Sequence, residues 1–194
     1  MRGAGLLARK FQLPFYATRG TFEALERHLP PGAERRILAQ DDEVALGGLR
    51  VQSYPTPHDG AESVAFVIRH EGRTLGHATD LGCIDQVVRE RLRDCDALLV
   101  ESNHDPELLR NGPYPWPLKQ RVGGDLGHLS NAACADLLTA VRHEALQTVV
   151  LMHLSETNNR PEIARRHAAA ALAGSPARLW VSHQDTPTPL IPVE

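Results

Sequence analysis

The sequence predicts an α/β fold with a mixed sheet and helices packed outside it. Apolar residues make up 42% of the 194 residues, which is enough for a packed core. Between residues 36 and 79, apolar and polar residues alternate with a period of two, as in half-buried strands. After residue 84, segments with helical spacing alternate with short apolar runs, and the run at 97–101 is expected to be a strand covered on both faces.

Helical spacing of apolar residues predicts six helical segments. They are residues 3–12, 21–28, 84–93, the single turn 106–110, 131–143 and 161–173. Thr21 and Ser130 are the expected N-caps of the second and fifth segments, because a hydroxyl there accepts a free N–H of the first turn. Pro161 suits the first turn of the last helix. Residues 112–121 contain three prolines and are expected to form a rigid loop.

Nine strands complete the pattern. They are residues 13–18, 36–39, 43–46, 49–54, 64–69, 73–79, 97–101, 148–152 and 178–181. Gly47-Gly48 and Glu71-Gly72 turn the chain between consecutive strands. The sequence has no internal repeat and no linker-like segment, so residues 1–194 are expected to form a single domain.

Charge and cysteine content restrict the class of function. The net charge is −3 and the pI is about 6.4, so any nucleic-acid binding must rest on local patches. Cys83, Cys95 and Cys134 form no CxxC pair and are expected to be reduced. No segment is apolar enough to span a membrane, and charges interrupt the first residues where a signal peptide needs its apolar stretch. A cytoplasmic protein is therefore expected.

Histidine and aspartate residues follow the ends of several predicted strands. His58, Asp80 and His153 each come after a strand, and His128 precedes the helix at residue 131. Side chains at the rim of a sheet escape the core while the backbone behind them is rigid. Imidazole and carboxylate groups are ligands that suit zinc or manganese. The pattern by itself indicates a metal-dependent hydrolase.

Each of these residues also has a structural alternative. His58 could be a solvated histidine of a turn. Asp80 could cap the following helix or close a turn through its own backbone. His153 could be a hydrogen-bonded core histidine, and His128 could be a neutral residue at a helix terminus. The residues at and just after the end of the strand at 97–101 either support the site or form a turn. They are Glu101, Asn103, His104 and Asp105.

Taken together, the motifs resemble those of the metallo-β-lactamase-fold hydrolases, most closely the YycJ-type group, which is related to the tRNA-processing endonucleases. The resemblance covers nearly all of the chain. The motifs, in the order of the family, are Pro57-His58-Asp59, Thr79-Asp80-Leu81-Gly82, Glu101-Ser102-Asn103-His104-Asp105, Tyr114-Pro115 with Leu118-Lys119, Gly127-His128-Leu129-Ser130-Asn131, and His153-Leu154-Ser155-Glu156 with Asn158-Asn159.

This resemblance implies an αββα sandwich with mixed sheets and a two-metal site at one edge. His58 would ligate one zinc or manganese ion, His153 the other, and Asp80 would bridge the two. His128 would meet the phosphate or protonate the leaving oxygen, so His128 and Asp80 are the expected catalytic residues.

The implied substrate is a phosphodiester, with nucleic acid as the expected partner. The expected substrate-binding residues are His128, Ser130, Asn103, Tyr114 and Lys119. Trp116 and Arg121 would add stacking and phosphate contacts, although Trp116 could instead pack over the sheet edge. The sequence decides neither the oligomeric state nor whether the nucleic acid is DNA or RNA.

The chain departs from the family at its start. The HxHxDH signature of the family is expected just before the segment at residues 3–18, and the sequence does not contain it. The fold is therefore expected to be N-terminally incomplete, with an unpaired strand edge and exposed apolar surface. Metal occupancy would be partial and phosphodiesterase activity weak or absent. The alternatives are a non-catalytic remnant, a partner-completed fragment, or the same fold acting on a small phosphodiester, a phosphonate ester or a thioester.

Overall fold

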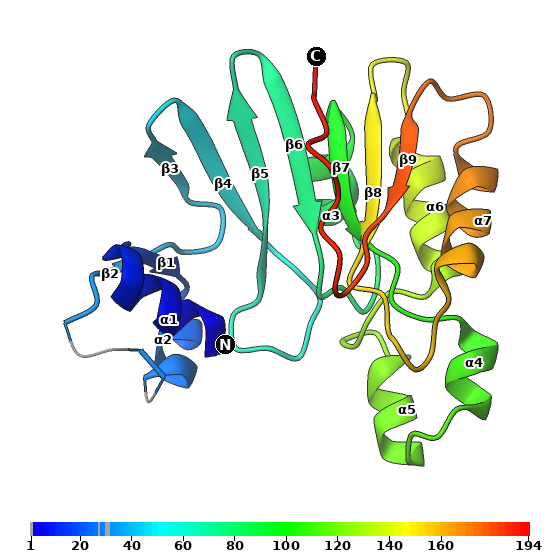
Figure 1. Cartoon of the computed structure of the whole chain (residues 1–194), viewed down its shortest axis with the longest axis horizontal. Coiled ribbons are helices and arrows are strands. Elements are labelled where there is room, and N and C mark those ends of the chain that lie inside the picture. Colours follow the sequence, from blue (N-terminus) through cyan, green and yellow to red (C-terminus); the bar gives the residue numbers. More distant parts are fainter. Residues whose placement is uncertain (1, 27, 30–31) are drawn as a thin grey trace.

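The computed structural model describes residues 2–26, 28–29 and 32–194, and two sheets make up its frame (Figure 1). The helices are α1 (Arg2–Phe11), α2 (Arg19–Leu25), α3 (Gln86–Leu92), α4 (Pro106–Asn111), α5 (Trp116–Val122), α6 (Asn131–Val141) and α7 (Pro161–Ala171). The strands are β1 (Phe15–Ala17), β2 (Arg35–Ile37), β3 (Glu43–Leu46), β4 (Leu49–Pro55), β5 (Val64–His70), β6 (Arg73–Ala78), β7 (Ala97–Glu101), β8 (Thr148–Met152) and β9 (Arg178–Val181).

The larger sheet has seven strands in the order β3-β4-β5-β6-β7-β8-β9. The pairs from β3 to β6 are antiparallel and the pairs from β6 to β9 are parallel. Strands β1 and β2 form a separate parallel pair. The predicted mixed α/β class is therefore confirmed, and the carboxyl ends of β6, β7 and β8 lie side by side at one edge.

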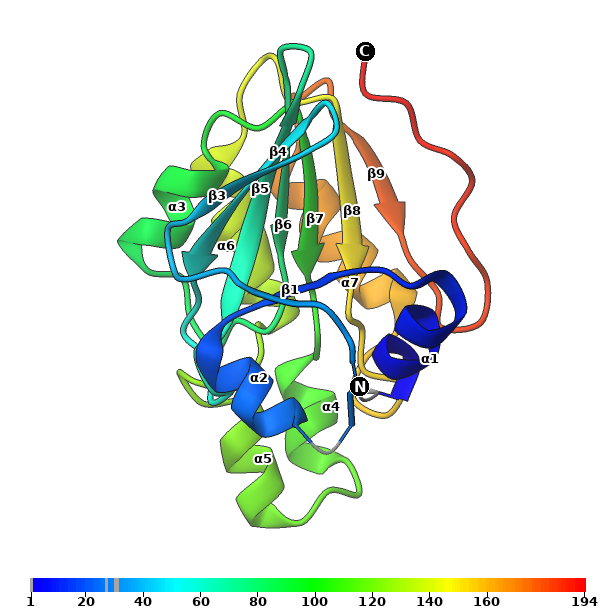
Figure 2. The same ribbon diagram turned by 90° about the vertical axis from the view of Figure 1, so that its left-hand side faces the viewer.

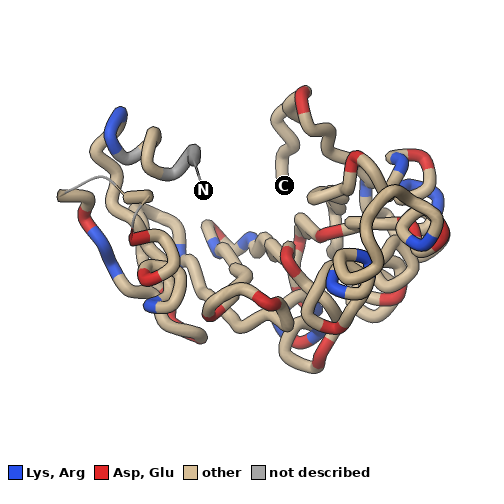
Figure 3. The backbone as a smooth tube through the Cα atoms, turned by 90° about the horizontal axis from the view of Figure 1, so that it is seen from below, with Lys and Arg blue, Asp and Glu red and all other residues tan. Residues whose placement is uncertain are grey.

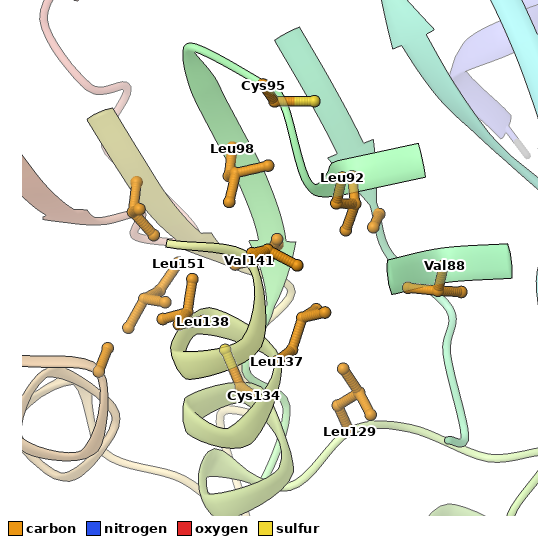
Figure 4. Packing of buried hydrophobic residues seen from close by; sticks show 14 of the residues in the cluster. Val88, Leu92, Cys95, Leu98, Leu129, Cys134, Leu137, Leu138, Val141 and Leu151 are labelled. Carbon is orange, nitrogen blue, oxygen red and sulfur yellow. The ribbon is translucent and has the colours of Figure 1, made fainter. Parts of the chain in front are cut away.

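One face of the larger sheet is packed against α3, α6 and α7. In Figure 4, Leu137, Leu138 and Val141 of α6 lie against Leu98 of β7 and Leu151 of β8. All five side chains are buried. Removing this apolar surface from water stabilises the fold by about 25 cal/mol per Å². The core thus fixes the strands whose ends carry the candidate site.

The opposite face of the sheet is less covered. Phe66, Ile68, Leu75 and Leu99 point to this face and are half-buried. The expected coverage of β7 on both faces is therefore incomplete in the described part of the chain. Figure 2 shows the C-terminal segment on the side of the sheet away from α3.

Acidic and basic residues are interspersed along the backbone (Figure 3). The helices in the described residues include none long and apolar enough to cross a membrane.

The structure corrects two local expectations. The predicted loop at 112–121 contains all of α5 except its last residue, Val122. Pro115 is the N-cap of this helix and Pro117 lies in its first turn, where a missing N–H costs no hydrogen bond. Helix α2 begins at Arg19, and its N-cap is Thr18, whose hydroxyl accepts the N–H of Thr21 at 3.3 Å. The expected cap at Ser130 is confirmed, since its Oγ accepts the N–H of Ala133 at 3.1 Å.

Candidate metal centre

Two of the predicted site residues, Asp80 and His153, lie just beyond the ends of β6 and β8, and their side chains approach each other. Asp80 and His153 both have a φ of 58°, in the left-handed region that a residue with a β-carbon rarely occupies. Such a conformation costs about 1–3 kcal/mol and persists only where the surroundings hold it. The two residues that the sequence singles out at these strand ends thus share an uncommon backbone conformation, which four other non-glycine residues of the described chain also adopt.

A buried carboxylate, Glu101 at the end of β7, organises the site. Its side chain is fully buried, and its Oε1 lies 2.8 Å from Nδ1 of His128 and 2.7 Å from Nδ1 of His153. Its Oε2 accepts the N–H of Leu81 at 2.9 Å. Glu101 therefore ties together three segments that are distant in the sequence.

The hydrogen bonds determine which atoms of Glu101, His128 and His153 carry protons. Burial acts to raise the pKa of Glu101, but the imidazole donors of His128 and His153 outweigh it, so the pKa lies below its ordinary value. The hydrogen bond to Glu101 in turn raises the pKa of His153. Because an ionised carboxylate only accepts, both histidines carry hydrogen on Nδ1. Their Nε2 atoms are therefore the nitrogens left for a ligand or substrate.

His58 approaches Asp80 from a different loop. Its Nδ1 lies 2.9 Å from the carbonyl oxygen of Gly127, so this nitrogen is the donor and Nε2 is free. Nε2 of His58 lies 3.7 Å from Oδ1 of Asp80, and Nε2 of His153 lies 3.9 Å from the same oxygen. The ring of His128 lies 5.1 Å from that of His58 and 5.2 Å from that of His153. The structure thus brings all four predicted residues together.

The donor set fits a divalent transition metal. Asp80, Glu101, His128 and His153 each offer a ligand atom within 4.8 Å of the others. We infer that Glu101 orients the histidines and does not itself bind the metal, because its oxygens are occupied by hydrogen bonds and it has no exposed surface. A carboxylate behind a histidine that leaves Nε2 free is the usual arrangement around bound metal ions.

Three loops lock the site by close backbone contact. The N–H of Gly82 donates to the carbonyl of Pro57 at 2.8 Å, and the N–H of Asp59 donates to the carbonyl of Leu126 at 3.0 Å. A β-carbon on Gly82 would lie only 2.2 Å from the carbonyl group of Asp125. The loops that carry His58 and Asp80 are therefore packed against the segment that leads to His128, and this packing is not visible in the sequence.

A salt bridge adds to this contact. Arg121 on α5 binds both oxygens of Asp59, with Nε–Oδ2 at 2.5 Å and Nη2–Oδ1 at 2.9 Å. The hydrogen bond from Arg121 lowers the pKa of Asp59. Arg121 thus holds α5 against the loop of His58, and its expected contact with phosphate stays a prediction.

The residues expected to bind substrate occupy different positions. Asn103 is buried and its amide donates to the carbonyl of His153 at 2.9 Å. Ser130 caps α6, Tyr114 is half-buried before α5, and Lys119 lies on α5. Asp105 takes the turn alternative, because its carboxylate accepts the N–H groups of Glu107 and Leu108 as the cap of α4.

Comparison with known proteins identifies relatives of this chain. The sequence matches the β-lactamase superfamily domain over residues 1–154. Exodeoxyribonuclease YycJ of Bacillus anthracis is 34% identical over 174 residues, which are 89% of this chain and 66% of that protein. Exodeoxyribonuclease WalJ of Streptococcus pneumoniae is 30% identical over an alignment of 200 positions that covers 98% of this chain and 74% of that protein. The chain thus spans about two thirds to three quarters of the length of these relatives.

Solved structures show the same fold at low identity. Zinc-bound PqqB from Methylobacterium extorquens superposes with a TM-score of 0.67 at 21% identity, over 93% of this chain and 66% of that one. The metallo-β-lactamase fold protein YhfI from Bacillus subtilis also has a TM-score of 0.67, at 13% identity, over 93% of this chain and 68% of that one. The chain therefore belongs to the β-lactamase superfamily, to the group of YycJ and WalJ within it, and has the metallo-β-lactamase fold.

Proposed function

We propose that this chain carries one side of the active site of a metal-dependent phosphodiesterase that cleaves DNA. The observation that carries the proposal is the convergence of His58 Nε2 and His153 Nε2 on one oxygen of Asp80, at 3.7 and 3.9 Å. Two relatives that are 30% identical or more are named exodeoxyribonucleases, which supports DNA as the substrate.

His58 and His153 would each hold one divalent ion, zinc or manganese, and Asp80 would supply a carboxylate to both. When bound, the ions supply Lewis-acid stabilisation to the phosphoryl group and to the attacking water. The approach of the two histidines from separate loops supports a two-ion arrangement. Glu101 keeps the ring of His153 oriented by accepting its Nδ1–H.

His128 is the proposed proton donor to the leaving oxygen. Glu101 holds its Nδ1, so Nε2 is the nitrogen that can reach a substrate, and 17% of the side chain is exposed. Loss of a general acid typically lowers the rate by about 10²–10⁴-fold. Tyr114 and Lys119 are proposed to contact the substrate, whereas Asn103 and Ser130 act through the backbone that they hold.

The donor count points to further ligands. Each ion would have one imidazole and a share of Asp80, whereas catalytic zinc usually has three protein ligands. We therefore propose that the remaining donors come from a segment outside residues 1–194, with an HxHxDH sequence, encoded upstream of Met1. The 194-residue chain alone should then show weak or no turnover. Robust manganese-dependent DNA degradation by this chain would contradict that part of the proposal.

Metal content and hydrolysis test the assignments separately. In the protein completed by the upstream segment, Asp80→Ala and His153→Ala should lower the metal content measured by elemental analysis. His128→Ala should keep the metal but degrade end-labelled single-stranded DNA about 10²–10⁴-fold more slowly. The exposed His70 supplies the matched control, because His70→Ala should change neither quantity. Unchanged stoichiometry in the Asp80 variant would rule out the ligand assignment.

A further inference from the structure

A cavity of about 340 Å³ lies between α4 and α5. Its lining comes from both helices and from the residues that precede α4 and α6, and it includes His104, Leu109, Trp116, Lys119 and Ser130. None of the hydrogen bonds that organise the metal centre uses Trp116 or Lys119. The cavity is therefore a separate feature whose chemistry can be considered by itself.

The cavity presents an exposed indole on rigid backbone. Trp116 is 65% exposed, which is unusual for so large an apolar side chain. It is the first residue of α5, between Pro115 and Pro117, whose rings fix the backbone on both sides. Because the backbone that carries the indole is fixed, only the side-chain torsions of Trp116 are ordered when a ligand stacks on it. This favours a planar aromatic ligand.

The cavity also carries a positive charge. Nζ of Lys119 donates to the carbonyl oxygen of Arg110 at 2.7 Å, and no carboxylate pairs with it in the described residues. Arg110 is instead paired with Glu107. An ammonium group has three donors, so Lys119 can hold its carbonyl partner and still bind an anion. The combination of an indole and an unpaired cation fits a nucleotide.

The deeper wall is polar and close to the metal centre. His104 is 4% exposed, and its Nδ1 has no hydrogen-bond partner within the described part of the chain. Burial lowers the pKa of His104, so its imidazole is neutral and can donate or accept. His104 pairs with Ser130 in an isolated bridge, and Ser130 lies two residues from His128, at most about 7 Å of extended chain. The wall of the cavity at Ser130 therefore lies next to the backbone that carries His128.

We propose that this cavity binds the base of the nucleotide next to the scissile phosphodiester of single-stranded DNA. The base stacks on Trp116, and Lys119 contacts its phosphate. Base–aromatic stacking of this kind is tolerant of sequence, as suits an enzyme that degrades DNA of any sequence. The inference rests on the proposed function, because it takes the phosphodiester to be cleaved beside His128.

Fluorescence can test the proposal without hydrolysis. The chain has two tryptophans, so Trp180→Phe leaves Trp116 as the sole indole emitter. A short single-stranded oligodeoxyadenylate, added in buffer with EDTA, should quench this emission saturably. An abasic strand with the same number of phosphates should bind on the order of 10-fold more weakly. Equal binding of the two strands, or no change in Trp116 emission, would overturn the proposal.

Variants separate stacking from charge. Trp116→Ala should weaken binding on the order of 10-fold, measured by anisotropy of a labelled strand, and Trp116→Phe should restore part of the loss. Leu190→Ala, at a fully exposed leucine of the C-terminal segment outside the cavity, is the matched control and should bind normally. Lys119→Ala should lower the salt slope of log K by about 0.7. Far-UV circular dichroism checks that each variant is folded.

The two proposals fail in different ways. If the completed, metal-loaded protein degrades DNA and Trp116→Ala binds and cleaves it normally, the cavity proposal fails and the proposed function stands. If Trp116 is quenched by the strand but the completed protein hydrolyses no phosphodiester, base binding is supported and the proposed function fails.

Discussion

At the scale of single residues, Glu101 explains why the site has its shape. It is a fully buried carboxylate, and burial of a charge is costly unless hydrogen bonds compensate for it. Donors from His128, His153 and Leu81 provide that compensation. The same hydrogen bonds that stabilise the charge also orient the two histidines, so folding and preparation of the site are one event.

Replacing this carboxylate should weaken metal binding without removing any ligand. Glu101→Gln leaves an amide of the same shape but without the charge. If the amide oxygen accepts the Nδ1–H groups of both histidines, the NH₂ group faces the N–H of Leu81, and two donors then meet. We expect metal affinity to fall by about 10–100-fold, as for other partners of metal-ligating histidines. Titration of the completed protein with zinc against a competing chelator measures the change. Glu90→Gln, on the exposed surface of α3, is the control, and equal affinity of the two variants would contradict the assigned role.

The sequence identified His58, Asp80, His128 and His153 because each stands next to the end of a predicted element. It left Glu101 as either a supporting or a turn residue. A glutamate at the end of an apolar strand is an anomaly that could have drawn attention. Its two histidine partners lie 27 and 52 residues away, however, and only the order of strands brings them together.

At the scale of elements, the start of α6 depends on one hydroxyl. Ser130→Ala removes the acceptor for the N–H of Ala133 and should lower the free energy of unfolding by about 1 kcal/mol. For a chain of this length, the melting temperature should fall by about 2–4 °C. Ser130→Asp should retain the cap and most of the stability. Calorimetry measures both, and a larger loss in the aspartate variant than in the alanine variant would contradict the capping role.

The interlocked loops predict a severe effect of one methyl group. Gly82→Ala would place a β-carbon 2.2 Å from the backbone of Asp125, which cannot move as a flexible side chain can. Overpacking of this kind costs about 1–3 kcal/mol. We expect both the unfolding free energy and the metal content to fall. Gly48→Ala lies outside the loops of the site and meets only the ring of His70, at 2.9 Å and at the end of a side chain, so it is the matched control. A stable Gly82→Ala protein with normal metal content would show that the loops are not coupled.

Helix α5 shows where reasoning by composition fails. Its prolines favoured a loop, yet two of them occupy the N-cap and the first turn, where proline is compatible with a helix. The periodic strands were predicted within a few residues of their observed bounds. Periodicity reports burial directly, whereas the effect of proline depends on its position within a turn.

At the scale of the whole molecule, the first forty residues keep much apolar surface in contact with water. Large side chains in this part are each more than half exposed; they are Leu6, Leu7, Phe11, Leu13 and Ile37. Exposed apolar side chains in this number offer surface that another segment or molecule can cover.

This surface should bind an apolar dye in the folded chain. We expect anilinonaphthalene sulfonate to fluoresce on addition of the 194-residue protein, because its apolar surface is exposed. Phe11→Gln with Ile37→Gln should reduce the signal without lowering stability, since both side chains are more than half exposed. Leu190→Gln, at an isolated exposed leucine, should leave the signal unchanged. Equal fluorescence of all variants would show that the dye does not bind at Phe11 and Ile37, and would contradict the prediction.

The sequence by itself determined the mixed α/β class, the positions of the strands and the loops that carry histidine and aspartate. These follow from periodicity and capping, which act between residues up to four positions apart. The tertiary structure decided that Glu101 holds two histidines, that Gly82 packs against Asp125, and that Trp116 and His104 line one cavity. These contacts join residues far apart in the chain, so they exist only once the strand order and the packing of the loops are set.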